Sequence, residues 1–122
     1  MRPFGELEAV IMDRLWSRPD PASVRDVLGE LQTARPLAYT TVMTVLDNLH
    51  RKGAVTREMV GRAWFYRPVG TREEHTAGLL RDVLGGGGDR RAALMHFVSE
   101  LEPDDIAELQ AAVKAAQRKK SP

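Results

Sequence analysis

The sequence predicts a mainly α-helical fold with one small β-hairpin, followed by a second helical region. Apolar residues recur with helical spacing in three segments of the first half of the chain. Residues 55–67 then alternate with a period of two, which is typical of strands. Helical spacing returns after the hairpin and continues towards the end. We therefore expect a first domain over residues 1–70 and a helical region over residues 71–122.

Positive charge is concentrated in one part of the chain. The whole chain has 122 residues and a formal net charge of +1 at pH 7, so its overall balance indicates no particular partner. Between residues 34 and 70, the only acids are Asp47 and Glu58, and the cations are Arg35, Arg51, Lys52, Arg57, Arg62 and Arg67. This local excess is able to attract a polyanion, and it is equally typical of a solvated basic surface.

Several kinds of chemistry are not expected. The sequence has no cysteine, which excludes disulfides, cysteine-based zinc or copper sites and cysteine nucleophiles. His50, His75 and His96 lack the spacing of metal ligands, so we expect ordinary satisfied or solvated histidines. The glycine run 85–88 lacks the Lys and Ser/Thr of a phosphate-binding loop. Because no nucleophile–base pair is evident either, we expect neither an enzyme nor a cofactor.

The sequence also predicts a cytoplasmic protein. The apolar run at residues 9–12 is short and is flanked by Glu6, Glu8 and Asp13, unlike the apolar core of a secretory signal peptide. No stretch approaches the length of about 20 apolar residues that a membrane-spanning helix needs. The lack of cysteine fits the same compartment.

The first two helices are indicated by apolar stripes and by signals at their ends. The first is expected over residues 6–17 and is stopped by the two prolines of residues 18–21. Its apolar stripe is Leu7, Val10, Ile11 and Leu15. The second begins at Ser23, because Ser23 followed by Asp26 is a variant of the capping box. Its buried face is expected to be Val24, Val27, Leu28 and Leu31, and residues 33–36 end it.

The third helix, expected over residues 38–52, has two different faces. One is an apolar stripe made up of Val42, Val45, Leu46 and Leu49. The other carries hydroxyl, amide, methyl and guanidinium groups on Thr40, Met43, Thr44, Asp47, Asn48 and Arg51. Such a mixture matches the donors, acceptors and thymine methyl groups of a DNA major groove, although a surface helix with several threonines would look the same. Tyr39 suits either a phosphate contact or packing, and Gly53 closes the helix.

A β-hairpin follows the third helix. Residues 55–67 alternate on both sides of Gly61-Arg62, a pair that predicts a tight turn with a cation at its tip. We expect Arg62 to contact a phosphate or the minor groove, whereas Arg57 and Arg67 suit either the DNA backbone or solvent. Packing at the core and the edge, rather than stacking on bases, is expected of the aromatic residues Trp64, Phe65 and Tyr66.

Helix, helix, helix, hairpin is the order of a winged helix-turn-helix domain, with Ala22 in a short strand-like link. In such domains the third helix enters the major groove, and the hairpin tip, or wing, touches phosphates or the minor groove. The pattern therefore predicts binding to double-stranded DNA. The residues predicted to contact DNA are Tyr39, Thr40, Thr41, Met43, Thr44, Arg51 and Arg62.

Short amphipathic helices are expected over residues 71–122. A helix over residues 71–84 is followed by the flexible glycine run 85–88, after which Asp89 caps one further helix and Pro103 opens the last. These helices have little of their own to bury against, so the simplest arrangement pairs them with a second copy of the chain. The residues predicted to build this homodimer are Leu79, Leu94, Phe97, Val98, Leu101, Ile106, Leu109 and Val113.

Several segments together resemble a known family. Residues 39–53, YTTVMTVLDNLHRKG, and residues 61–68, GRAWFYRP, carry most of the likeness, and residues 7–16, 24–27 and 105–109 fit the same pattern. Over nearly the whole chain, they resemble the BlaI/MecI family of bacterial penicillinase repressors. The resemblance implies a homodimeric winged-helix repressor on a palindromic operator with TACA/TGTA half-sites, controlling β-lactam-response genes.

The resemblance also implies how repression ends. In the family, a membrane sensor-protease detects a β-lactam and the repressor is cleaved in its C-terminal region at an Asn-Phe bond, where this chain has His96-Phe97. The family often has a lysine where this chain has Met43, so contacts there are expected to differ. The cysteine-rich tail of the copper-responsive relatives is absent. The competing interpretation is a winged helix used for protein–protein interaction.

Overall fold

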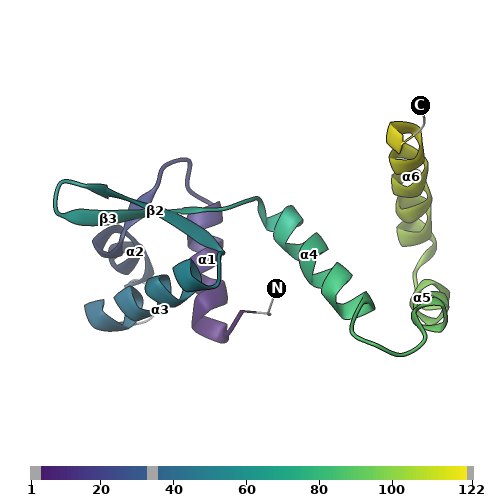
Figure 1. Ribbon diagram of the computed structural model, residues 1–122, viewed down its shortest axis with the longest axis horizontal. Coiled ribbons are helices and arrows are strands. Elements are labelled where there is room, and N and C mark those ends of the chain that lie inside the picture. Colours follow the sequence, from purple (N-terminus) through teal and green to yellow (C-terminus); the bar gives the residue numbers. More distant parts are fainter. Residues whose placement is uncertain (1–3, 33–35, 121–122) are drawn as a thin grey trace. The chain divides into compact units, whose positions relative to one another are not determined.

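The computed structural model describes residues 4–32 and 36–120 and has a mainly α-helical chain with one small sheet (Figure 1). Its elements in chain order are α1 (Glu6–Trp16), β1 (Ala22–Ser23), α2 (Val24–Leu31), α3 (Tyr39–Arg51), β2 (Val55–Val60), β3 (Ala63–Pro68), α4 (Arg72–Leu84), α5 (Arg90–Ser99) and α6 (Pro103–Lys120). The predicted fold class is therefore confirmed. The chain divides into two compact units, residues 1–82 and 83–122, and the first of them includes most of α4.

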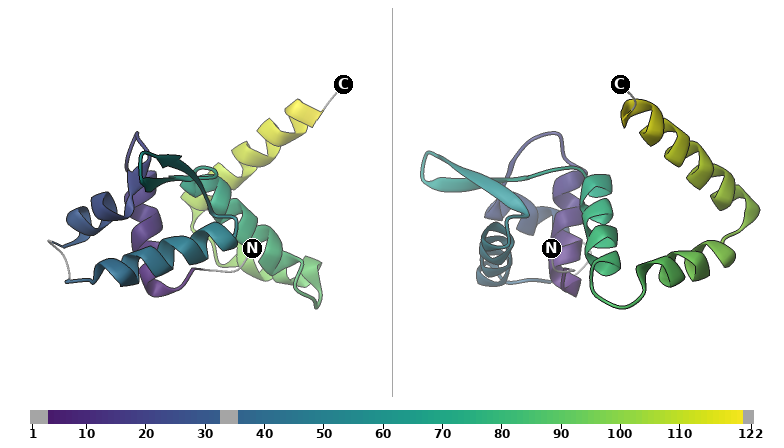
Figure 2. Two further views of the ribbon diagram at one scale, coloured as in Figure 1. Left: turned by 60° about the vertical axis from the view of Figure 1, so that its left-hand side comes forward. Right: turned by 45° about the vertical axis from the view of Figure 1, so that its right-hand side comes forward.

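Helices α1, α2 and α3 lie together with the sheet beside them (Figures 1 and 2). Their apolar stripes form the core of the first unit. The buried core comprises Ile11, Met12, Leu15, Ala22, Val24, Val27, Leu31, Val42, Leu46, Leu49, Ala54, Val55 and Tyr66. Partly buried at its margin are the remaining stripe residues Leu7, Val10, Leu28 and Val45. Because burying one such side chain is worth about 1.5–3 kcal/mol, these stripes decide which face of each helix turns inward.

The helix ends follow the expected signals. Ser23 Oγ accepts a hydrogen bond from the Asp26 N–H at 3.0 Å, and the Ser23 N–H donates to Asp26 Oδ2 at 3.0 Å. This capping box starts α2 as predicted. Gly53 follows α3 with a φ of +78°, a left-handed conformation that favours glycine. The stop signal expected from residue 33 onward falls largely on residues 33–35, Arg35 among them, which lie outside the described residues.

The sheet is antiparallel with the strand order β1-β3-β2. Ala22 pairs with Tyr66, so the expected strand-like link is confirmed as a third strand. At the tip of the hairpin Val60 pairs with Ala63, and Gly61 has a φ of +65°. A left-handed glycine at the first of two turn positions is the pattern of a type II′ turn, which matches the twist of the flanking strands. The wing and its tip therefore lie where the sequence predicts.

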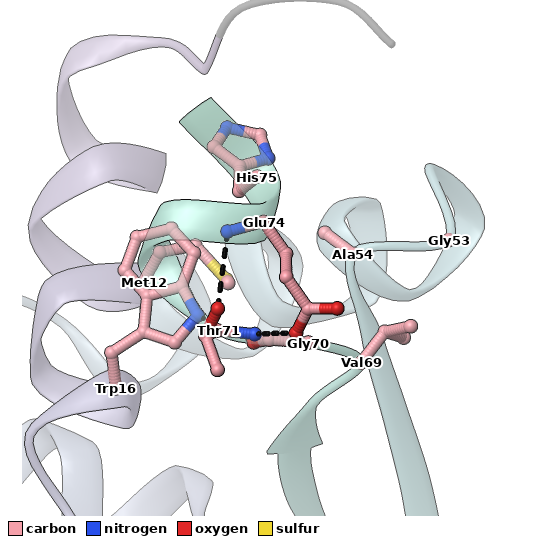
Figure 3. A pocket seen from close by; sticks show the side chains of 9 residues that line it. All are labelled: Met12, Trp16, Gly53, Ala54, Val69, Gly70, Thr71, Glu74 and His75. Carbon is pink, nitrogen blue, oxygen red and sulfur yellow. Dashed lines mark hydrogen bonds between the residues drawn. The ribbon is translucent and has the colours of Figure 1, made fainter. Parts of the chain in front are cut away.

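The start of α4 is attached to α1 (Figure 3). The Trp16 Nε1–H donates to the Gly70 carbonyl oxygen at 2.9 Å, directly before α4 begins. Thr71 caps α4, because its Oγ1 accepts from the Glu74 N–H at 3.0 Å and its own N–H donates to Glu74 Oε1 at 2.9 Å. The His75 ring stacks on Phe4 with 4.2 Å between ring centres. These contacts explain why most of α4 belongs to the first unit.

The second unit consists of the end of α4, a glycine run, α5 and α6. Gly87 and Gly88 have left-handed φ angles of +111° and +77°, which other residues adopt with strain. Asp89 Oδ1 accepts from the Ala92 N–H at 3.1 Å and caps α5, and Pro103 is the first residue of α6, both as predicted. Figure 2 shows α5 and α6 meeting at a short turn and then diverging. Neither helix contains a buried residue, so this unit has no core of its own.

Candidate nucleic-acid interface

One face of α3 is anchored in the core and the other is open. Val42, Leu46 and Leu49 are fully buried, which fixes the rotation of the helix about its axis. The residues predicted to contact DNA from this helix are all exposed: Tyr39, Thr40, Thr41, Met43, Thr44 and Arg51. Ala38 at the N-cap provides no side-chain acceptor, and the first turn contains no acid. The positive end of α3 is therefore available to an anion such as a phosphate.

A groove of about 400 Å³ runs between the starts of α2 and α3 and strand β3. Tyr39 and Met43 line it from α3, and Arg62 and Trp64 line it from the wing. The fold thus brings three of the predicted contact residues together although they lie on different elements. Arg25, exposed in the first turn of α2, also lines the groove and was not singled out from the sequence. The sequence could have indicated Arg25 through its position at the start of the helix before α3, because winged-helix proteins approach the DNA backbone there.

Arg57 is turned inward rather than towards solvent. Its Nη1 lies 3.5 Å from Asp47 Oδ1 of α3, and its guanidinium carbon lies 4.2 Å from the centre of the Trp64 ring. The same carboxylate also pairs with Arg51, with 2.6 Å between Arg51 Nη2 and Asp47 Oδ2. The side chain of Arg51 is 73% exposed and that of Arg57 only 25%. Arg51 is thus accessible to a ligand, and Arg57 is held by the protein.

Lys52, in the basic segment, is also occupied by the protein. Its Nζ lies 2.7 Å from Glu8 Oε1 and joins the end of α3 to α1. Burial raises the pKa of Glu8, but the hydrogen bonds from Lys52 and from the Gly5 N–H outweigh it and hold that pKa below its ordinary value. Arg62, by contrast, is exposed at the wing tip and forms no ion pair with another residue that the structure describes. The basic segment therefore contains both structural and accessible cations.

The aromatic residues of β3 pack in different environments. Tyr66 is buried in the core and Phe65 is partly buried, as packing at the core and edge predicts. Trp64 is 39% exposed, with the Arg57 guanidinium over its ring and one side towards the groove. Its indole is therefore a wall of the groove rather than part of the core.

The residues predicted for dimerisation leave an apolar surface on the second unit. Leu94, Phe97, Val98, Leu109 and Val113 are between 37% and 56% exposed. Leu101 and Ile106 are partly buried, as is Leu79 on α4 of the first unit. Large apolar side chains exposed on neighbouring turns are typical of an interaction surface. His96 and Phe97, the predicted cleavage position, are both exposed but lie within the helix α5.

Neither a metal site nor a membrane span is found in the described part of the chain. In residues 4–32 and 36–120, no group of three or more His, Asp or Glu side chains is placed to hold a metal ion. Among the same residues, no helix combines the length and apolar character needed to cross a bilayer. His75, which the sequence left as an ordinary histidine, is partly buried against Phe4 and Trp16, and this burial lowers its pKa.

A buried three-helix core, an exposed polar face on α3 and a hairpin with a cation at its tip define a winged-helix protein of the DNA-binding type. Comparison with known proteins identifies the family to which this winged-helix protein belongs. Residues 4–115 match the model of the penicillinase repressor family, so the chain belongs to that family of transcriptional regulators. The family resemblance noted from the sequence is confirmed, and so is the expectation of a regulator rather than an enzyme.

Individual relatives agree with this placement. The chain is 46% identical over 113 residues to the transcriptional regulator BlaI of Mycobacterium tuberculosis, covering 90% of this chain and 82% of that protein. The solution structure of the DNA-binding domain of the repressor BlaI matches with a TM-score of 0.52 and 23% identity, over 61% of this chain and 93% of that one. Bacillus licheniformis BlaI, solved in monomeric form with the blaP half-operator, matches with a TM-score of 0.50 and 23% identity, over 60% and 88%. These two structures support the winged-helix fold.

Proposed function

We propose that this transcriptional repressor binds a palindromic operator as a homodimer, with α3 as the recognition helix and the β2–β3 hairpin as the wing. The groove that brings Tyr39, Met43 and Arg62 together carries the proposal, because it presents residues of α3 and of the wing on one continuous surface. The solved relative from Bacillus licheniformis was captured with a half-operator, which supports the same use of this fold. The regulated genes that the family suggests are β-lactam-response genes.

The contact residues divide into two groups by their chemistry. Thr40, Thr41, Met43 and Thr44 carry hydroxyl and methyl groups suited to base edges and to the thymine methyl. Arg51 and Arg62 are exposed cations suited to phosphates, Tyr39 can donate its hydroxyl to one, and Arg25 extends the same track. The first group would provide sequence preference, and the second affinity and register.

The apolar surface of α5 and α6 is proposed to pair with a second copy of the chain. Its exposed leucine, valine and phenylalanine side chains have no core to join within the second unit. Two copies bring two recognition helices to one palindrome, and linked binding sites raise the overall affinity without any new type of contact.

Relief of repression is proposed to involve a membrane sensor-protease that acts at His96-Phe97. Both residues are exposed, but the bond between them lies inside α5. A protease needs an extended substrate, so cleavage would require local opening of α5 and release of Phe97 from the proposed dimer surface. Loss of α5 and α6 would then separate the two halves of the dimer.

DNA binding at a series of salt concentrations tests the proposed function. We expect a duplex with TACA and TGTA half-sites to be bound more tightly than a scrambled duplex of the same composition. The affinity should fall steeply with salt, since each neutralised phosphate adds about 0.9 to the slope of log K against log salt. A protein that binds neither duplex at low salt would instead support the winged helix as a protein–protein interaction module.

A further inference from the structure

Three side chains from three elements connect the wing to α3. Asp47 of α3 lies 3.5 Å from Arg57 of β2, measured from Oδ1 to Nη1. Arg57 in turn lies over the ring of Trp64 in β3, 4.2 Å from its centre. The contacts therefore run from the helix through one strand to the other. The attraction between the cation and the indole ring strengthens an ion pair that contributes little by itself when it is exposed.

The register of the hairpin explains why these residues meet. Arg57 pairs with Tyr66 and Met59 pairs with Trp64, so Arg57 and Trp64 are diagonal neighbours on one face of the hairpin. Diagonal neighbours lie about 7–8 Å apart, within reach of a long side chain and an aromatic ring. Tyr66 on the same face is buried, which shows that this face turns towards the body of the first unit. Arg57 is thus directed at α3.

We propose that Asp47, Arg57 and Trp64 form a helix–wing brace, a set of positioning residues that hold the wing at the angle needed for DNA. The proposal rests on the proposed function, in which α3 and Arg62 contact DNA on either side of one backbone. A hairpin that is already held in place loses little freedom on binding. A hairpin without the brace must be ordered by the DNA, and this ordering lowers the affinity.

The brace also explains an acid on a face that is otherwise suited to DNA. A carboxylate repels phosphates, so Asp47 would weaken binding if it acted only through its charge. Its two oxygens instead hold two arginines, Arg57 through Oδ1 and Arg51 through Oδ2. When Arg51 turns to a phosphate, Arg57 keeps the carboxylate as a partner, and the wing stays in position.

A double-mutant cycle on operator DNA tests the brace. We expect Arg62→Ala to weaken binding by about fivefold to tenfold in the wild-type chain, and by less than about twofold when Arg57→Met or Asp47→Asn is already present. The reason is that an unpositioned wing makes little use of Arg62. Equal losses from Arg62→Ala in all backgrounds would show that these residues do not position the wing.

Arg67→Met is the matched control for the cycle. Arg67 pairs with Thr56 and therefore lies on the opposite face of the hairpin from Arg57. Its replacement removes the same charge from the wing but leaves the helix–wing brace intact. In this background Arg62→Ala must keep its full effect on affinity; a reduced effect would mean that the coupling reflects charge alone, which would also overturn the proposal.

A measurement on the free protein separates the brace from DNA binding. The chain has two tryptophans, so a proton–nitrogen NMR spectrum contains two indole signals. Arg57→Met should move the Trp64 signal and leave the Trp16 signal, whose N–H donates to the Gly70 carbonyl, unchanged. An unmoved Trp64 signal would overturn the brace. If Arg57→Met moves the Trp64 signal but the wild-type chain binds no DNA, the proposed function is refuted and the brace is not.

Discussion

The arginines of the basic segment have the same chemistry but differ in how far the protein itself occupies their guanidinium groups. Arg57 is held between Asp47 and Trp64, whereas Arg51 is largely exposed and pairs with Asp47 along its own helix. Such a helical surface pair is worth only about 0.3–0.5 kcal/mol, so a phosphate replaces it easily. Arg62 is exposed at the end of the wing. The position of each arginine in the fold, and not its presence in the sequence, decides its role.

Replacement of Arg62 by alanine should weaken binding about equally on operator and unrelated DNA. A phosphate contact contributes affinity without sequence information, so specificity should change little. The slope of log K against log salt should decrease by about 0.9, the value of one lost phosphate contact. Fluorescence anisotropy at several salt concentrations measures both quantities. Arg118→Ala, which removes the same charge from α6, is the control, and a slope unchanged by Arg62→Ala would remove the wing tip from the interface.

At the scale of elements, helix ends and short contacts place α3 and α4. The stripe of α3 fixes its rotation in the core, and Gly53 allows the chain to turn from the helix into the wing. The first turn of α4 is held by Trp16 and by the stack of His75 on Phe4, and Arg72 of the same turn pairs with Asp13 of α1. The attachment of α4 to α1 is therefore sensitive to the charge of one histidine.

The free energy of unfolding should fall as the pH is lowered below about 6.5, the ordinary pKa of histidine. Burial lowers the pKa of His75, so the folded state binds its proton less readily than the unfolded state. Its contribution is complete above the ordinary pKa and is lost as the pH falls through the lowered one. Urea denaturation at pH values from about 7.5 to 5.5 should show this loss in the wild-type chain.

His75→Phe should remove the pH dependence in that interval, because phenylalanine keeps a ring against Phe4 but cannot be protonated. His96→Phe, at an exposed position of α5, should leave the dependence intact. The pKa values of Asp26 and Glu74 are lowered by backbone hydrogen bonds, and these carboxyl groups titrate in a separate interval below about pH 4.5. The same pH dependence in wild type and His75→Phe would rule out His75 as its source.

At the scale of the whole molecule, the two units differ in how they are stabilised. Residues 1–82 contain the buried core, whereas α5 and α6 contain no buried residue and expose a row of large apolar side chains. The glycine run before α5 includes two residues with left-handed φ angles and open space around them. A second unit of this kind has little apolar burial to stabilise it alone, and we propose that a second copy of the chain covers its apolar surface.

Phe97→Glu should therefore convert the proposed dimer into monomers of 13.6 kDa. A carboxylate placed on the apolar surface loses hydration without gaining a partner, which opposes association. Analytical ultracentrifugation at micromolar concentration measures the mass, and operator affinity should fall at least about tenfold because bivalent binding is lost. Ala111→Glu adds the same charge at an exposed position of α6 on the side away from Ile106, Leu109 and Val113, and should remain dimeric. A dimeric Phe97→Glu protein would contradict the assigned interface.

The sequence by itself determined the features that depend on residues close together in the chain. The apolar stripes, the capping box at Ser23, the glycine at the end of α3, the turn at Gly61 and the proline start of α6 all depend on spacings of four residues or fewer. The family resemblance could also be read from the sequence, because it is carried by short runs such as residues 39–53. Physical preferences of this range are the same in any fold that contains these elements.

Only the tertiary structure decided which of these residues meet across the fold. The inward position of Arg57 depends on the strand register and on Asp47, ten positions away on another element. Arg25 joined the groove because the start of α2 lies beside the wing, and His75 met Phe4 because α4 attaches to α1. Contacts of this kind follow from how buried faces pack together, and no local pattern encodes them. The roles of individual cations therefore became distinguishable only in the folded molecule.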